Sequence, residues 1–171
     1  MNMQIRNIAT IYVFDGDNIL LMHRVGSRLF QGSIWVGIGG HFEMDEMSDP
    51  HKCAMRELME ETGLSQNDVS TLKLKYITTR RASGEIRQQY IFVTDLINKS
   101  AELIESNEGR IHWVPLSELY SRKMAYSNTE CLKHYLDIGK LDDNIYVGAV
   151  GAIEEGLLVQ FTALKEYGID K

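Results

Sequence analysis

Short apolar runs recur along the chain, and their lengths and bounding turn residues predict β-strands. Ile8–Phe14 and Asn18–Arg24 flank Asp15-Gly16-Asp17, a sequence typical of a hairpin turn. A second hairpin turn is predicted at residues 81–84, and a third at residues 154–156. The other runs that predict strands are Ile34–Ile38, Leu72–Thr79, Ile86–Leu96, Arg110–Val114, Ile145–Val150 and Leu157–Phe161.

One central segment has the periodicity of an amphipathic helix and residues that mark both of its ends. Asp49 supplies a cap, and Pro50 suits the first helical position, where the N–H that it lacks would have no helical partner. Ala54 and Leu58 lie four residues apart on one apolar stripe, and Gly63 is a natural C-terminal cap. We therefore predict a helix over residues 50–62.

The order of the elements indicates a fold class and a division of the chain. A second helix is predicted at Thr129–Leu136, with Gly139 at its end. Strands on both sides of a central helix favour an α/β or α+β sandwich around a mixed sheet. The length of 171 residues suits one domain, which we place at 1–140, with an extension at 141–171. Because an isolated hairpin is only marginally stable, the extension should dock on the main sheet or on a partner chain.

Composition narrows the class of protein. Hydrophobic residues make up 44% of the chain and charged residues 25%, which are values of globular proteins. No apolar run is long enough to predict a membrane span, and the first residues do not resemble a secretory signal. Cys53 and Cys131 are too few for a disulfide framework and lack metal-site spacing. We expect both to be reduced and buried, which favours a cytoplasmic location.

The net charge of −6 is unevenly distributed. Residues 41–61 contain seven acidic and two basic residues, whereas residues 73–87 contain five basic residues and one acidic residue, Glu85. An acidic chain is a poor binder of nucleic-acid polymers. An acidic segment beside a basic one favours a divalent metal with an anionic substrate, although two solvent-exposed faces would give the same counts.

The predicted central helix carries a distinctive set of glutamates. Glu57, Glu60 and Glu61 are spaced i, i+3 and i+4, so the three carboxylates share one face. Their repulsion would be relieved by a hard divalent cation such as Mg²⁺, which prefers oxygen ligands. Gly39 and Gly40 would let a backbone carbonyl approach the same ion closely. The alternative is an acidic helix face exposed to solvent.

These residues match a known motif, G-x5-E-x7-R-E-U-x-E-E-x-G-U, where U is a bulky aliphatic residue. Gly40, five residues and Glu46 match its first half, and Arg56-Glu57-Leu58-x-Glu60-Glu61-x-Gly63-Leu64 matches its second half. The chain therefore resembles the Nudix hydrolases of the MutT type. Nine residues rather than seven separate Glu46 from Arg56, which predicts a two-residue loop insertion within residues 47–51.

The resemblance implies a fold, an activity and a metal. The fold is a Nudix α/β/α sandwich with a central mixed sheet, to which this chain adds a C-terminal β-hairpin extension. The activity is hydrolysis of a nucleoside diphosphate linked to a group X, with Mg²⁺ as cofactor and Mn²⁺ as a substitute. The implied metal ligands are the Gly39 carbonyl, Glu57, Glu60 and Glu61.

The resemblance also assigns catalytic and substrate-binding residues. The catalytic set is Arg56, Glu57, Glu60 and Glu108; the glutamates include the base, and Arg56 orients a glutamate by a charge-assisted hydrogen bond. The substrate-binding set is Arg24, Arg87 and Asn128.

Two interpretations stay open for several of these residues. Arg24, Arg80 and Arg87 either contact phosphate or lie on the surface of their strands. Asn128 either reads a purine base or caps the second helix. Glu108 is either part of the site or a turn residue.

The leading functional prediction is hydrolysis of a nucleoside triphosphate, with oxidised nucleotides such as 8-oxo-dGTP as the first candidates. Asn128 and the run Trp35-x-Gly37-x-Gly39-Gly40 favour it, whereas Val36 replaces an asparagine of the eukaryotic sanitising enzymes. The alternatives are a pyrophosphatase for ADP-ribose, dinucleotides or NDP-sugars, and a non-catalytic nucleotide-binding module. The three glutamates argue against the module. The expected partners are a nucleotide and, through the extension, a second copy, with neither nucleic acid nor membrane.

Overall fold

The computed structural model describes residues 3–26, 32–82, 84–104, 106–154 and 156–166. Within these ranges eight strands form one sheet, in the order β3-β2-β1-β5-β4-β7-β8, with β6 paired to β2. The β1–β5 and β4–β7 pairs are parallel and the others are antiparallel, so the sheet is mixed as predicted. The strands are β1 (Gln4–Asp15), β2 (Asn18–Val25), β3 (Ser33–Val36), β4 (Lys73–Ala82), β5 (Glu85–Asp95), β6 (Arg110–Pro115), β7 (Ile145–Ile153) and β8 (Gly156–Leu164).

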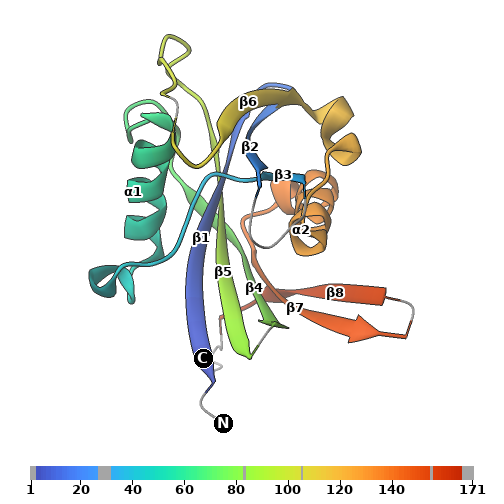
Figure 1. Cartoon of the computed structure of the whole chain (residues 1–171). Helices are drawn as coiled ribbons and strands as arrows, with labels where there is room; N and C mark the ends of the chain where they lie inside the picture. The colour runs from blue at the N-terminus through green and yellow to red at the C-terminus, as the bar shows by residue number, and fades with distance from the viewer. Residues whose placement is uncertain (1–2, 27–31, 83, 105, 155, 167–171) are drawn as a thin grey trace, which may run out of the picture.

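Two α-helices lie on opposite faces of this sheet. Figure 1 shows α1 (Pro50–Thr62) on one side of the strands and α2 (Tyr126–Asp137) on the other, which confirms the α/β/α arrangement. Three short 3₁₀ helices, η1 (Met44–Glu46), η2 (Leu116–Ser121) and η3 (Gly139–Leu141), complete the described elements. In the described part of the chain, neither α-helix has the length and apolar character that a bilayer crossing requires.

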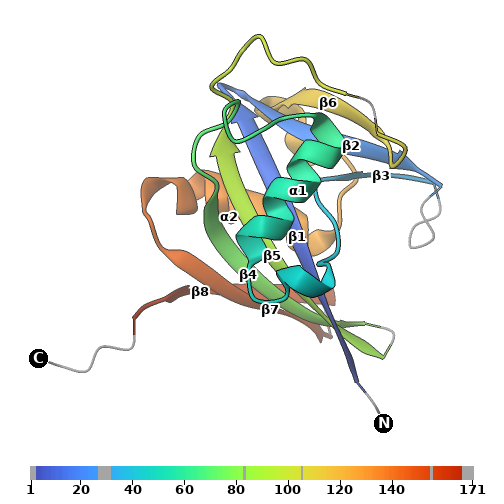
Figure 2. The same cartoon turned by 90° about the vertical axis from the view of Figure 1, so that its left-hand side faces the viewer.

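Strand β1 supplies both hydrophobic layers because successive side chains of a strand point to opposite faces. Ala9, Ile11 and Val13 pack on the α1 side, with Cys53 and Leu58 of the helix. Tyr12 and Phe14 belong to the cluster on the α2 side, which also contains Cys131 and Leu132. Both cysteines are buried and free. Figure 2 shows α1 crossing in front of the strands that it covers.

Helix α1 begins and ends where the sequence predicts. The Asp49 side chain accepts from the Lys52 N–H at 3.1 Å, and Pro50 opens the helix. Gly63 adopts a left-handed conformation with φ 77°, and its N–H donates to the Met59 carbonyl. The alternative interpretation, an acidic helix face exposed to solvent, is wrong for two of the three glutamates, since Glu57 and Glu61 are buried.

Helix α2 begins three residues before the prediction, at Tyr126. The N-cap is Ala125, whose side chain makes no capping hydrogen bond. Asn128 therefore lies within the first turn, and the alternative that it caps the helix is wrong. Its backbone N–H donates to the Ala125 carbonyl at 3.0 Å, as expected of a residue inside the first turn.

The predicted C-terminal hairpin is present as β7 and β8 and extends the main sheet. β7 pairs in parallel with β4, from Tyr76↔Tyr146 to Arg80↔Val150. One face of the hairpin packs against α2: the centroid of the His134 ring of α2 lies 4.6 Å from that of Tyr146 and 4.8 Å from that of Phe161. The opposite face carries exposed apolar side chains, among them Val147, Ile153, Leu158 and Leu164.

Candidate active site

A glycine-containing segment after β3 runs beside β1 and carries the backbone of the site. The Ala9 N–H donates to the Gly40 carbonyl at 2.9 Å, and the Ile11 N–H donates to the Ile38 carbonyl at 2.7 Å. Gly39 has φ 140°, and a Cβ there would lie 2.2 Å from the Ala9 carbonyl oxygen. A Cβ on Gly40 would lie 2.5 Å from a carboxylate oxygen of Glu57. The two glycines thus let a helix carboxylate lie against bare backbone.

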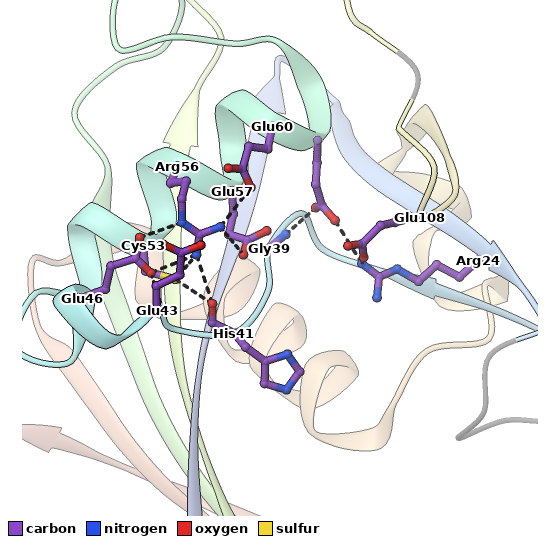
Figure 3. Close-up of polar contacts among 11 residues, drawn as sticks. Arg24, Gly39, His41, Glu43, Glu46, Cys53, Arg56, Glu57, Glu60 and Glu108 are labelled. Carbon is purple, nitrogen blue, oxygen red and sulfur yellow. Dashed lines mark hydrogen bonds and ion pairs between the residues drawn. The ribbon is translucent and has the colours of Figure 1, made fainter.

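Arg56 is the centre of an ion cluster on α1, drawn in Figure 3. Its guanidinium donates to Glu46 in a bidentate arrangement, Nε to Oε1 at 2.7 Å and Nη2 to Oε2 at 2.9 Å. Its Nη1 donates to Glu57 at 2.9 Å and to Glu60 at 3.0 Å. The contact with Arg56 lowers the pKa of Glu46 to about 2. Arg56 is therefore placed to orient Glu57, as the resemblance implies.

The longer spacing between Glu46 and Arg56 does not separate their side chains. Glu46 ends η1, and its Oε2 accepts from the Glu43 N–H at 2.8 Å. The Asp49 N–H donates to the Glu46 carbonyl at 2.8 Å, so a tight turn connects η1 to the start of α1. This turn accommodates the extra residues, and Glu46 meets Arg56 as the first glutamate of the motif would.

Burial gives two of the motif glutamates unusual acid strengths. Glu57 is 7% exposed and Glu61 is 3% exposed. Burial raises the pKa of Glu57, and the nearby Arg56 offsets only part of this effect. Burial likewise raises the pKa of Glu61 to about 7, although the Gly39 N–H donates to it at 2.7 Å. The contacts within the protein therefore stabilise the ionised form of these two carboxylates less than water does.

A second arginine joins two more carboxylates to the site. Arg24, near the end of β2, donates through Nη2 to Glu61 at 3.0 Å and to Glu108 at 2.5 Å. Glu108 lies in the turn before β6, with its side chain 57% exposed. Figure 3 shows this pair on the far side of Gly39 from Arg56. The structure thus brings the predicted catalytic and metal residues around one backbone segment.

The donor chemistry of this segment fits a hard divalent cation, because every candidate ligand is an oxygen and two are buried carboxylates. In the arrangement described, Arg56 and Arg24 take up several of these oxygens. Among the described residues, no three His, Cys, Asp or Glu side chains are grouped closely enough to hold a metal. Metal binding would therefore draw these carboxylates closer together, and Glu57 and Glu60 each give Arg56 only one of their two oxygens.

A cavity of about 900 Å³ connects the ion cluster to the α2 side of the sheet. All the predicted site residues except Glu61 line it, and Glu61 lies behind Gly39. Asn128 is 7% exposed, and its Oδ1 is buried without a hydrogen-bond partner in the described part of the chain. None of the lining residues belongs to β7 or β8, so these strands do not form a wall of the cavity among the described residues.

Sequence reasoning missed some of the cavity. Arg6, Ile8 and Thr10 of β1 line it, together with Glu85 and Gln89 of β5. The period-two alternation of β1 was the available signal, but the predicted strand began at Ile8 and left Arg6 outside. Arg87, predicted from the sequence, is ion-paired with Glu85.

Comparison with known proteins identifies this arrangement. The family model described as the NUDIX domain matches residues 3–135. The mutator MutT protein from Bacillus halodurans is 25% identical, with 91% of this chain and 97% of that chain covered and a TM-score of 0.66. A Nudix hydrolase from Nitrosomonas europaea is 15% identical, with 87% and 80% covered and a TM-score of 0.68. An Ap4A hydrolase from C. elegans is 16% identical, with 78% and 96% covered and a TM-score of 0.61.

The last two likenesses establish a shared fold, whereas the family model spans most of the chain. The match to the family model also includes the whole motif from Gly40 to Leu64. The chain belongs to the Nudix family and is a hydrolase acting on pyrophosphate bonds.

Proposed function

We propose that this hydrolase cleaves the pyrophosphate bond of a purine nucleoside triphosphate or another nucleoside diphosphate linked to X, with Mg²⁺ as cofactor. One observation carries the proposal. The cavity that reaches Glu57 and Glu60 is also lined by Asn128, whose buried oxygen has no hydrogen-bond partner among the residues that the structure describes. A buried amide oxygen without a donor is costly, and the N–H groups of a purine base are suitable donors. Oxidised purines such as 8-oxo-dGTP are the first candidates.

The residues of the chain have distinct parts in this reaction. The bound metal, held by the Gly39 carbonyl and the carboxylates of Glu57, Glu60 and Glu61, would neutralise phosphate charge and orient the chain of phosphates. Glu57 is the best-placed base for the attacking water, because its carboxylate lines the cavity and Arg56 holds it in place at 2.9 Å.

The arginines and Glu108 act around that centre. Arg56 keeps the Glu57 carboxylate aligned through its contact at 2.9 Å. Arg24 bridges Glu61 and Glu108, and on substrate binding its guanidinium would turn to phosphate oxygens, for which its fork geometry is suited. The products are a nucleoside monophosphate with pyrophosphate, or with a phosphorylated X.

A panel of nucleotides tests the proposal. The purified protein is incubated with Mg²⁺, and separately with Mn²⁺, and with dGTP, 8-oxo-dGTP, dCTP, ADP-ribose, ADP-glucose and Ap4A. Products are identified by chromatography and mass spectrometry. We expect metal-dependent release of a nucleoside monophosphate, fastest from a purine substrate. Tight binding without turnover of any nucleotide would instead identify a nucleotide-binding module.

The role of Asn128 has its own test and a matched control. Asn128→Ala should lower kcat/KM for purine substrates by about 1–3 kcal/mol, the usual cost of an unpaired buried polar group, and should affect pyrimidine substrates less. Thr129→Ala is the control, because Thr129 is the next residue of α2 and does not line the cavity. Equal losses for all bases would show that Asn128 does not read the base.

Two further predictions from the sequence remain part of this proposal. The two free, buried cysteines are what we expect of a cytoplasmic enzyme. A homodimer would form through the exposed apolar face of β7 and β8, and light scattering of the purified protein measures its mass directly. The dinucleotide alternative is supported by three arginines that line the cavity, Arg6, Arg80 and Arg87, because a dinucleotide carries additional phosphate charge.

A further inference from the structure

Three arginines lie side by side on neighbouring strands and form a basic end of the cavity. Arg6 of β1 pairs in register with Arg87 of β5, and Arg87 pairs with Arg80 of β4. These three strands are neighbours in the sheet, as Figure 1 shows, and all three side chains line the cavity. We call this set of three residues the arginine row.

The arginine row contains more positive charge than its surroundings compensate. Glu85 contacts Arg6 at 2.6 Å and Arg87 at 2.5 Å, in both cases through the Nε of the arginine. Arg80 is only partly exposed and has no carboxylate partner among the described residues. Burial and the neighbouring Arg87 both lower the pKa of Arg80. Three guanidiniums and one carboxylate leave two positive charges at this end.

A purely structural role does not account for this arrangement. Like charges directly opposite each other on neighbouring strands destabilise a sheet. Solvent relieves such repulsion at an exposed site, but the Arg87 side chain is only 16% exposed. The Nε contacts with Glu85 hold two guanidiniums at their inner nitrogens, so their outer N–H donors remain for a ligand with several acceptor oxygens.

We propose that the arginine row binds a phosphate group carried by the X part of the substrate, and so selects substrates with a phosphorylated X. This inference rests on the proposed function, which places the pyrophosphate bond that is cleaved at the glutamates of α1. A phosphate monoester carries about −1.5 to −2 charges near pH 7, which matches the two uncompensated positive charges. A volume of about 900 Å³ is near the upper end for small-molecule sites, so it admits a group beyond the diphosphate and the base.

The first experiment measures phosphate binding without any catalysis. The metal-free protein, kept in EDTA at constant ionic strength, is titrated with inorganic phosphate by calorimetry. Arg80→Gln and Arg87→Gln should each weaken binding about tenfold or more, since each removes a charge-assisted contact. Arg81→Gln should leave binding unchanged, because Arg81 is the next residue of β4 and points, exposed, to the other face of the sheet.

The second experiment separates phosphate on X from free phosphate. It compares kcat/KM for ADP-ribose and for ADP-ribose 1″-phosphate, which differ by one phosphate on X. The wild type should prefer the phosphorylated compound, and Arg80→Gln should reduce that preference about tenfold while Arg81→Gln keeps it. Phosphate binding that is lost in Arg80→Gln without any substrate preference would show a site for free phosphate and overturn the role in selection.

The outcomes distinguish this inference from the proposed function. Equal phosphate affinity in the wild type, Arg80→Gln and Arg87→Gln would overturn the arginine row as a phosphate site, even if the nucleotide panel shows turnover. Failure of the panel to show any turnover would overturn the proposed function, and the calorimetry would still decide whether the row binds phosphate.

Discussion

Two ion clusters line one cavity and have opposite compositions. At one end a single cation, Arg56, is surrounded by three glutamates of η1 and α1. At the other end a single carboxylate, Glu85, stands against the three residues of the arginine row. The first cluster has surplus negative charge and suits a divalent cation, whereas the second has surplus positive charge and suits an anion.

The two clusters also differ in how firmly the fold holds them. Glu46, the main partner of Arg56, is 1% exposed, and the Arg56 side chain is 22% exposed. Glu85 is held in part by Arg6, whose side chain is 49% exposed. We infer that the acidic end has a rigid anchor that serves folding as well as catalysis. At the basic end Glu85 divides its contacts between half-exposed Arg6 and the less exposed Arg87, so only the Arg6 contact is readily screened by salt.

The largest effect is expected from removing one carboxylate of the acidic end. Glu57→Gln, Glu60→Gln and Glu61→Gln should each lower turnover by ~10²–10⁴-fold, the range for positioned acid-base groups. The stability of the metal-free protein should hold or rise at neutral pH for Glu57→Gln and Glu61→Gln, because burial raises the pKa of both carboxylates. Turnover and melting temperature are measured with and without Mg²⁺.

The response to metal completes this test. Metal stabilises the folded protein in proportion to its affinity, so the rise in melting temperature on adding Mg²⁺ should shrink in all three variants. Near-wild-type turnover in all three would contradict the assignment of the motif. A large loss of metal-free stability would show that the glutamates are structural.

The next effect concerns the anchor of the same cluster. Glu46→Gln should destabilise the protein by roughly 3 kcal/mol at pH 7, since it breaks a buried ion pair. The folded pKa of Glu46 is lowered to about 2, so its stabilisation is present above the unfolded value near 4.5 and is lost as the pH falls towards 2. Urea unfolding at pH 7, 5 and 3 should show the difference between variant and wild type shrinking with acidity.

Glu60→Gln is the matched control for stability, because Glu60 contacts the same guanidinium at 3.0 Å but its side chain is 57% exposed. An exposed pair of this kind contributes about 0.5 kcal/mol or less. A loss of stability as large in Glu60→Gln as in Glu46→Gln would contradict the distinction between a buried anchor and an exposed ligand.

The sequence was sufficient for most of the fold, because its signals are local. Asp49, Pro50 and Gly63 act through the backbone of one helix, and the structure places α1 between them as predicted. Each predicted strand also has a counterpart in the sheet. The start of α2 was missed because Ala125 and Tyr126 have no capping side chain to mark it. The pairing of β7 with β4 could not be predicted from local signals, because it joins residues about 70 positions apart.

The site was predicted less completely because burial and register are not local. The spacing of Glu57 and Glu61 gives a common face, but it does not show that this face is buried under Gly39 and Gly40. Arg6 becomes part of a site only through the parallel pairing of β1 with β5, which no short motif encodes.

A smaller effect is expected from displacing a catalytic carboxylate without removing its charge. A Cβ at Gly40 would lie 2.5 Å from the Glu57 carboxylate, which is the mobile end of a side chain and can move. Gly40→Ala should therefore lower kcat about 10- to 100-fold, as small misplacements of catalytic groups do, with little change in melting temperature. Gly151→Ala is the control, since a Cβ there meets nothing within 4 Å. Unchanged kcat would show that the position of Glu57 is not critical.

The smallest effect is expected at the basic end, where the anchor is weak. Glu85→Gln should lower stability less than Glu46→Gln does in 0.15 M salt, because Glu85 contacts each of its two arginines through a single Nε and the pair with half-exposed Arg6 is screened. The cost should grow at low ionic strength, where three arginines repel one another without a carboxylate between them, and added phosphate should restore stability. Urea unfolding at several salt concentrations measures this. If Glu85→Gln destabilises the protein as much as Glu46→Gln does, irrespective of salt, then the two clusters are anchored alike and the basic end is structural.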